Sequence, residues 1–162
     1  VRDSKTAAEE AKTAAEILGI SVLRCAELET LDLHLDRTLI EIILRVVEEK
    51  KIDIIYTHWI HDAHPDHYIT AQATLAASRH VPRLLMYRSN YYPSTAPFNG
   101  TFFKNITATI DQKVKAIRAY KSEYDRAGCK WLDHLTKQNE IDGQAVGVKY
   151  AECFEIVKYL GA

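Results

Sequence analysis

The sequence lacks the features that mark several specialised classes of protein. It has three cysteines and no CxxC pair, so it presents no disulfide framework and we expect buried, reduced thiols. These cysteines are Cys25, Cys129 and Cys153. The formal net charge is −1, and without an excess of either sign we expect no binding to nucleic acid or to an acidic membrane surface.

Long apolar runs are also absent. The longest, such as residues 39–47, contain Glu41 and Arg45 and fall short of the ~18–20 apolar residues of a membrane span. No segment combines a basic start with an apolar centre, as a signal peptide does. With 47% hydrophobic and 27% charged residues, residues 1–162 suit a single globular domain, and we expect a cytoplasmic protein.

Apolar periodicity predicts alternating helices and strands in the first part of the chain. Helices are predicted at residues 6–18, from Asp36 to about residue 51 and at residues 66–79, and strands at residues 20–23, 52–57 and 84–87. Gly19 follows the first helix as a C-cap, and Asp36 precedes the second as an N-cap. This alternation is typical of βαβ units, so we predict an α/β fold with a Rossmann-like, mostly parallel sheet flanked by helices.

The second part of the chain gives weaker signals. Residues 88–100 include two prolines and Gly100 and predict a loop. The remaining predicted elements are a strand at residues 102–110, a helix at 111–124 capped by Asp111, a short helix at 130–138 and, at 148–157, either a helix or a strand.

Histidines are concentrated in one segment. The residues that follow the predicted strand 52–57 include His58, His61, His64 and His67. Ligands of open α/β sheets bind at the carboxyl ends of the strands, so a site is expected here. Neutral imidazole and carboxylate are ligands of catalytic zinc, and Asp62 or Asp66 could orient an imidazole. The spacing leaves two alternatives: His64 and His67 divide into a metal ligand and an acid, or the loop is a solvated surface segment.

The stretch T-H-W-I-H-D-A-H-P-D-H at residues 57–67 resembles the second motif of the PIG-L/LmbE-type deacetylases. Members of this family are zinc hydrolases that remove an acetyl group from N-acetylglucosamine-containing substrates. Three further segments resemble the family in the same order along the chain. They are Glu10 with the helix end at residues 14–20, residues 105–107 with Lys113 and Ala116, and the Y-A-E-C-F segment at residues 150–154.

The resemblance implies a role for each titratable residue at the end of this motif. His67 would bind a single zinc ion, and His64 would stabilise the oxyanion at the acetyl carbonyl and protonate the leaving amine. Asp66 would pair with His64 and raise its basicity, and Asp62 would support the site from behind. The implied reaction releases acetate and a free amine from a small amino-sugar substrate.

Contacts to the substrate are expected from Arg88, Asp62 and Tyr91. Arg88 follows a predicted strand at the same end of the sheet, and Tyr91 lies in the loop that comes next. The alternative for Arg88 is an ordinary surface arginine, and Tyr91 could pack rather than stack on a sugar ring. We assign Trp59 to packing. Ala7 stands where the family often has an arginine, so we do not expect this family contact to the sugar from the first helix.

The sequence departs from the family in one respect. The family's first motif, of the type H-P-D-D-E, supplies two zinc ligands and the general base, and these 162 residues do not contain it. We therefore expect the domain to be N-terminally incomplete, with its first strand, helix and second strand in a separate segment of the same protein. Residues 1–162 alone are then expected to bind zinc weakly and to lack activity.

Two other functions remain open. The chain could be a catalytically inactive relative or a partner-binding fragment, or it could hydrolyse another amide on the same scaffold. The sequence is also compatible with a homo-oligomer.

Overall fold

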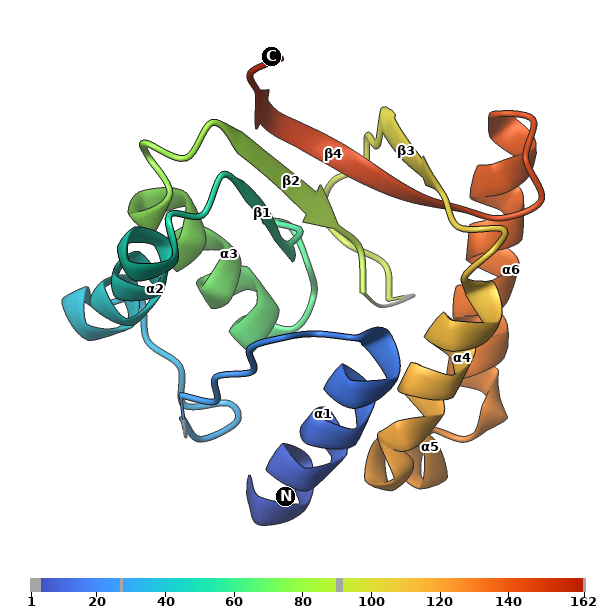
Figure 1. The fold of residues 1–162 in the computed structure, drawn as a ribbon, viewed down its shortest axis with the longest axis horizontal. Helices are drawn as coiled ribbons and strands as arrows, with labels where there is room; N and C mark the ends of the chain where they lie inside the picture. Colours follow the sequence, from blue (N-terminus) through green and yellow to red (C-terminus); the bar gives the residue numbers. More distant parts are fainter. Residues whose placement is uncertain (1–3, 27, 90–91, 162) are drawn as a thin grey trace. The chain divides into compact units, whose positions relative to one another are not determined.

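The computed structural model describes residues 4–26, 28–89 and 92–161, apart from the side chains of Ser4 and Cys129 (Figure 1). Contacts within it divide the chain into two compact units. The helical unit comprises Val1–Glu27 and Phe103–Glu152, and the sheet unit comprises Leu28–Phe102 and Cys153–Ala162. None of the helices in the described ranges is long and apolar enough to cross a membrane.

Helices and strands both build the architecture, which confirms the predicted α/β class. The helices are α1 (Ser4–Leu18), α2 (Arg37–Lys50), α3 (Pro65–Ala77), α4 (Ile110–Ala119), α5 (Lys121–Ala127) and α6 (Cys129–Ala145). The strands are β1 (Ile54–His58), β2 (Arg83–Tyr87), β3 (Phe102–Asn105) and β4 (Ala151–Tyr159). The strands form one sheet in the order β1-β2-β4-β3.

β1 and β2 are the parallel pair of the sheet. Their register places His58, the last residue of β1, opposite Tyr87, the last residue of β2. Because the two strands point the same way, the residues that follow them emerge at the same edge of the sheet. β4 pairs antiparallel with β2, with a register shift between Leu84 and Leu85, so an antiparallel strand joins the parallel pair that the sequence predicts.

The core of the sheet unit lies along β2. Its largest fully buried apolar side chains, none more than 2% exposed, are Leu84, Leu85 and Met86. α3 packs against β1, and α2 packs against α3 (Figure 1). The Thr57 hydroxyl donates to that of Thr74 at 3.3 Å where β1 meets α3. This hydrogen bond ties the second half of α3 to the end of β1.

Several helix ends follow signals in the sequence. Asp36 caps α2 as predicted, because its carboxylate accepts a hydrogen bond from the Leu39 backbone N–H at 2.9 Å. Gly19 follows α1 with a φ of 70°, in the left-handed region that glycine tolerates best. α3 begins at Pro65, which has no N–H to leave unpaired, and His64 is its N-cap.

Residues from the family-like segments hold the helical unit together. α1 packs against α4, and Glu10 on α1 caps α5. The Glu10 carboxylate accepts hydrogen bonds from the backbone N–H and the hydroxyl of Ser122, at 2.7 and 2.8 Å. Lys113 on α4 forms an ion pair with Glu152 on β4. Within this unit, Glu10, Lys113 and Glu152 therefore have structural contacts.

Some predicted boundaries in the second half are wrong. Residues 111–124 form two helices because Tyr120, with a ψ of 63°, leaves the helical conformation between α4 and α5. Asp111 lies in the first turn of α4 rather than at its cap. α6 extends to Ala145, β3 ends at Asn105, and residues 151–159 are a strand. Helical spacing in this region was too weak to place these ends.

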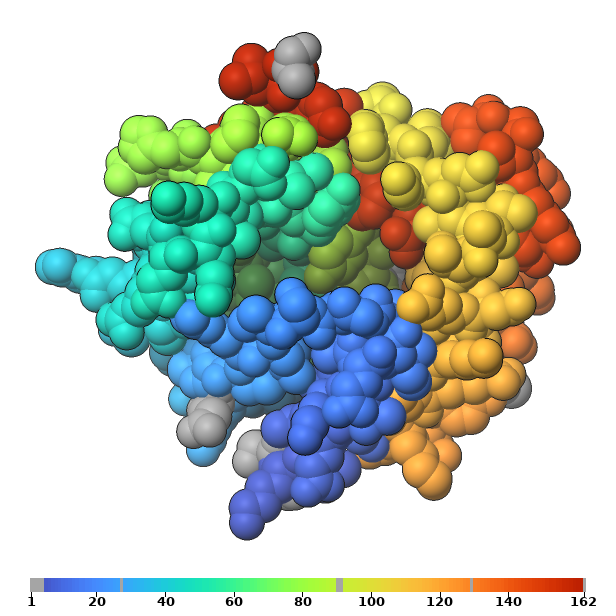
Figure 2. All heavy atoms as spheres, viewed as in Figure 1, coloured from blue at the N-terminus to red at the C-terminus, as the bar shows by residue number. Residues whose placement is uncertain are grey.

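The strand predicted at residues 20–23 does not form. The segment pairs with no strand in the described part of the chain, and Ile20 and Val22 are 50% and 52% exposed. It follows α1 along the surface in Figure 2. An apolar segment becomes a strand only where a neighbour supplies ladder hydrogen bonds.

The prediction of buried, reduced cysteines is wrong for Cys25, which is exposed. Cys25 and Cys153 are free thiols. The Cys129 side chain lies outside the described residues.

Candidate active site

The carboxyl ends of β1 and β2 gather a cluster of polar side chains in the sheet unit. The cluster contains His58, Asp62, His64, His67 and Ser89. Pairing continues beyond the strands, because the Trp59 N–H donates to the Tyr87 carbonyl at 2.9 Å. The loop between β1 and α3 is thereby held next to the segment that follows β2. The sequence placed a site at this edge, and most of the cluster comes from the predicted His-rich segment.

His58 lies between Tyr87 and Ser89. The Tyr87 hydroxyl is 3.4 Å from His58 Nε2, and the Ser89 hydroxyl is 3.3 Å from His58 Nδ1. Burial, together with the nearby His67, lowers the pKa of His58 to about 4, so the ring is neutral at neutral pH. Burial raises the pKa of Tyr87 to about 12, so the phenol keeps its proton.

Asp62 is the buried carboxylate of the cluster, with a side chain only 2% exposed. Its oxygens lie 2.8 Å from the His64 backbone N, 3.0 Å from the Ser89 hydroxyl and 3.2 Å from His67 Nδ1. Burial favours a higher pKa for this carboxyl. The hydrogen bonds from His64 and Ser89 and the charge interaction with His67 outweigh it and hold the pKa below its usual value. Asp62 is therefore ionised and accepts from all three neighbours.

The direction of the Ser89 hydroxyl proton determines which ring nitrogen of His58 and of His67 is protonated. Ser89 donates that proton to Asp62 Oδ2. Its oxygen also lies 3.0 Å from His67 Nδ1 and 3.3 Å from His58 Nδ1. A hydroxyl has one donor and two acceptor positions, so both Nδ1 atoms must carry protons and donate to Ser89. This leaves His58 Nε2 to accept from Tyr87, and leaves a lone pair on His67 Nε2 that accepts from none of the described residues.

His64 has the opposite arrangement. As the N-cap of α3, its Nδ1 accepts a hydrogen bond from the Asp66 backbone N–H at 3.2 Å. A neutral imidazole with an unprotonated Nδ1 carries its proton on Nε2. The rings of His64 and His67 are stacked with centroids 4.6 Å apart. Two neighbouring imidazoles thus present different groups: an N–H donor on His64 and a lone pair on His67.

The Asp66 carboxylate lies elsewhere than the sequence suggested. It accepts from the backbone N–H of Leu31, with its two oxygens 3.0 and 3.2 Å from that nitrogen. The expected side-chain pairing of Asp66 with His64 is not among the contacts of the described residues. Asp66 instead acts on His64 through its own backbone N–H, because His64 caps the helix in which Asp66 occupies the first turn.

The donor set fits a zinc ion in chemical type. His58, Asp62 and His67 each offer a ligand atom, and these atoms lie within 4.8 Å of one another. Imidazole and carboxylate are ordinary zinc ligands. In the present arrangement, however, His58 uses both nitrogens on Ser89 and Tyr87, and Asp62 holds His67. A histidine whose Nδ1–H donates to a carboxylate is the usual arrangement behind a metal ligand, which favours binding through His67 Nε2.

Sequence reasoning missed Ser89 and the role of His58. The signal for His58 was its place at the end of a predicted strand. Ser89 had no local signal, because only the parallel register of β1 and β2 brings it to the cluster. Of the predicted substrate residues, Arg88 lies with its guanidinium 4.9 Å from the centre of the Phe98 ring. Tyr91 lies outside the described residues.

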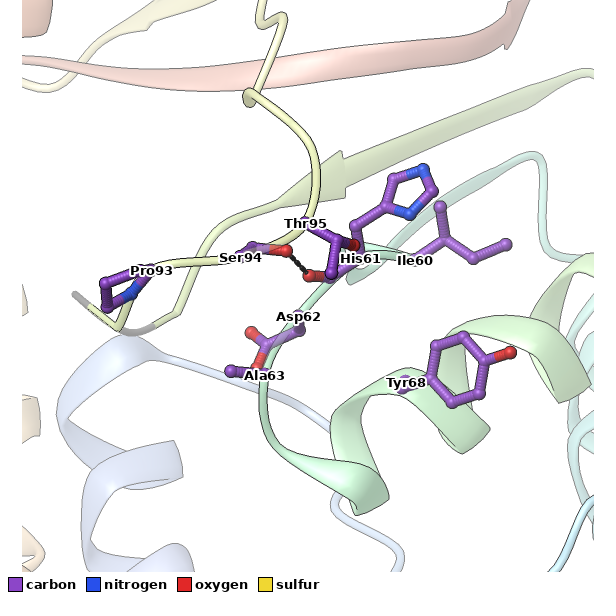
Figure 3. Close-up of a pocket in the computed structure, with 8 residues that line it drawn as sticks. All are labelled: Ile60, His61, Asp62, Ala63, Tyr68, Pro93, Ser94 and Thr95. Carbon is purple, nitrogen blue, oxygen red and sulfur yellow. Dashed lines mark hydrogen bonds between the residues drawn. The ribbon is translucent and has the colours of Figure 1, made fainter.

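A pocket of about 450 Å³ opens beside the cluster. It is lined by Ile60, His61, Asp62, Ala63, Tyr68, Pro93, Ser94 and Thr95 (Figure 3). The Ser94 hydroxyl donates to the His61 carbonyl and joins the two loops that form the walls. Tyr68 on α3 forms another wall, and its hydroxyl accepts from the Gln72 amide at 2.9 Å. The pocket shares Asp62 with the cluster but is not lined by the imidazoles of His64 and His67.

Fold and site together define an α/β protein with a histidine–aspartate site at the carboxyl ends of parallel strands. Residues 2–78 match the family described as PIG-L: GlcNAc-PI de-N-acetylase. The resemblance predicted from the motif is thereby confirmed for this part of the chain, which contains His58, Asp62, His64 and His67.

Similar folds occur in several solved structures. A conserved protein from Thermus thermophilus has a TM-score of 0.83 and 23% identity, over 99% of this chain and 77% of that one. The N,N'-diacetylchitobiose deacetylase from Pyrococcus horikoshii has a TM-score of 0.79 and 18% identity, over 94% of this chain and 63% of that one. GalB, the 4-carboxy-2-hydroxymuconate hydratase from Pseudomonas putida, has a TM-score of 0.76 and 18% identity, over 98% of this chain and 73% of that one. The chain thus spans less than two thirds of the Pyrococcus protein. At these identities the likeness establishes the fold.

Proposed function

We propose that the protein containing this chain is a zinc-dependent N-deacetylase that removes an acetyl group from an N-acetylglucosamine-type sugar or conjugate. The match of residues 2–78 to the de-N-acetylase family supports the reaction class. Deacetylases of N,N'-diacetylchitobiose and of the A40926 pseudoaglycone share the fold. Fold alone does not decide the chemistry, since a hydratase also has it.

The observation that carries the proposal is that His64 and His67 carry their protons on different ring nitrogens. His64 Nδ1 accepts from the Asp66 N–H, and His67 Nδ1 donates toward Asp62. One imidazole therefore offers a proton and its neighbour offers a lone pair. Amide hydrolysis at a metal needs both, because charge develops on the carbonyl oxygen and the amine leaves only after it gains a proton.

His67 would hold the metal through Nε2, with Asp62 fixing the ring from behind. When bound, zinc polarises an amide carbonyl and lowers the pKa of water. By resemblance, two further ligands and the general base come from an H-P-D-D-E segment outside residues 1–162. Such a segment is part of the proposal, and with its two ligands the site would bind zinc more strongly than residues 1–162 alone.

His64 would act on the acetamide itself. Its Nε2–H would donate to the carbonyl oxygen as water adds to the carbon and negative charge accumulates. It would then give its Nε2 proton to the nitrogen as the C–N bond breaks, and would take up in its place the proton that the general base removed from the attacking water, so that acetate and a free amine leave. Asp66 supports this role through its backbone N–H, which keeps the proton on Nε2.

The test is an assay of acetate release from N-acetylglucosamine and its conjugates, with the natural full-length protein and zinc. We expect His64→Ala to lower kcat by about 10²–10⁴-fold, the usual contribution of a general acid. His80→Ala is the matched control, because His80 is exposed and lies outside the cluster. Absence of acetate release from all substrates, or an unaffected His64→Ala variant, would contradict the proposal. Hydration of an unsaturated carboxylate instead would point to the chemistry of the hydratase neighbour.

A further inference from the structure

We infer that Ser89 is a positioning residue that fixes the tautomer of His67, so that Nε2 is the nitrogen available to a metal. No sequence motif includes Ser89, and it lies 22 residues beyond His67 in the chain. The inference rests on the proposed function only for its consequence in metal binding. The tautomer itself can be measured without a metal.

Three contacts converge on the Ser89 hydroxyl. Its oxygen is 3.0 Å from Asp62 Oδ2, 3.0 Å from His67 Nδ1 and 3.3 Å from His58 Nδ1. These neighbours come from the end of β1, the following loop and the first turn of α3. Ser89 follows β2 by two residues, so the register of the parallel pair carries it to the cluster.

The balance of donors and acceptors leaves one arrangement. Asp62 is ionised and can only accept, so Ser89 gives it the hydroxyl proton. Ser89 can then only accept from the two imidazoles, which must both be protonated on Nδ1. A protonated Nδ1 in a neutral ring leaves Nε2 unprotonated. The serine thus transmits the charge of Asp62 to the tautomer of His58, and for His67 it adds a second acceptor beside Asp62 for the proton on Nδ1.

Removal of the hydroxyl would loosen this arrangement. His67 Nδ1 would keep Asp62 as its acceptor but lose Ser89, and Asp62 Oδ2 would lose its donor. His58 Nδ1 would lose the hydroxyl that lies 3.3 Å away. The tautomer with the proton on Nε2 would then compete at His67, and this tautomer cannot bind a metal through that atom.

The experiment compares imidazole ¹⁵N NMR spectra of the metal-free, full-length protein at a pH where its histidines are neutral. The His67 signals are identified by their loss in His67→Gln. In the unaltered protein we expect His67 to be protonated on Nδ1. In Ser89→Ala we expect a shift toward Nε2–H, and zinc affinity ~10–100-fold weaker, the usual effect of losing a partner behind a ligand. Ser89→Thr keeps a hydroxyl and should restore both properties.

The matched control is Ser78→Ala, the same substitution at another buried serine of the sheet unit. Ser78 is fully buried, and its hydroxyl has no hydrogen-bond partner among the described residues. It should change neither the His67 spectrum nor zinc affinity. An unchanged His67 tautomer in Ser89→Ala would overturn the inference.

If Ser89→Ala fails to fold, Ser89→Cys provides the same readout with a weak donor and acceptor in place of the hydroxyl. If the full-length protein binds no zinc or releases no acetate, the proposed function fails, and the spectra still decide the inference about Ser89.

Discussion

The imidazole rings of His58 and His67 are stacked, with their centroids 3.9 Å apart and 4° between their planes. This contact joins the end of β1 to the first turn of α3. Both rings also place Nδ1 near the same hydroxyl, that of Ser89. The stacking and the shared hydrogen-bond partner together hold His67 in one orientation.

His58→Phe separates these two effects. Phenylalanine can keep the ring contact with His67 but offers no nitrogen to the Tyr87 and Ser89 hydroxyls, which are partly buried. We expect a loss of about 1–3 kcal/mol in the free energy of unfolding, the usual result when buried polar groups lose their partner. Urea unfolding followed by circular dichroism measures it. An unchanged unfolding midpoint would show that the hydroxyls find other partners.

Asp62→Asn tests the carboxylate that links the cluster. The amide keeps the shape of the side chain but loses the charge, and its NH₂ group cannot accept from His67 or Ser89. We expect zinc affinity to fall ~10–100-fold while the protein stays folded. Titration calorimetry with zinc provides the measurement. Asp32→Asn is the matched control, because the Asp32 side chain is 72% exposed and lies outside the cluster.

Glu155→Ala tests the anchor of the loop between β1 and α3. One oxygen of Glu155 on β4 accepts from the Trp59 indole N–H at 3.1 Å and from the Asn99 backbone N–H at 3.2 Å. Trp59 is only 5% exposed, so its N–H would lose a buried partner. We expect about 1–3 kcal/mol of destabilisation and a change in tryptophan fluorescence. Glu155→Gln keeps an acceptor oxygen and should lose less; equal losses would contradict this role.

Zinc should raise the thermal unfolding midpoint of the full-length protein. A ligand that binds only the folded state stabilises it by about 2.7 kcal/mol at a free concentration of a hundred times Kd. His67→Ala should abolish the shift, and His80→Ala should retain it. Differential scanning calorimetry with and without a chelator measures both. An equal shift in His67→Ala would mean that the metal binds at another site.

The start of α3 shows what sequence alone can predict here. The sequence predicts a helix from residue 66, and α3 begins one residue earlier, at Pro65, which suits the first helical position because it has no N–H. His64 comes immediately before it in the chain. That local geometry is enough to give His64 its tautomer. The resemblance to a known family added the role of His67, which spacing had left open.

The partner of His67 shows where sequence reasoning ended. The sequence paired the Asp66 carboxylate with His64 and named no particular acceptor for His67, and the carboxylate that contacts the His67 ring belongs to Asp62. Adjacent residues at a helix start point in different directions, and Asp66 turns toward the N–H of Leu31. Ser89 depends on strand register over an even longer separation. Contacts made across a fold leave no periodic signal along the chain.

The cap formed by His64 has a consequence for how the site could fail. The Asp66 N–H is held toward His64 Nδ1 only while the first turn of α3 is intact. Fraying of that turn would release the imidazole from its single tautomer even if every side chain of the cluster remained in place. Local order at this helix end and the proton available for chemistry therefore depend on the same hydrogen bond. A substitution far along α3 that loosens its first turn would act on the acid without touching it.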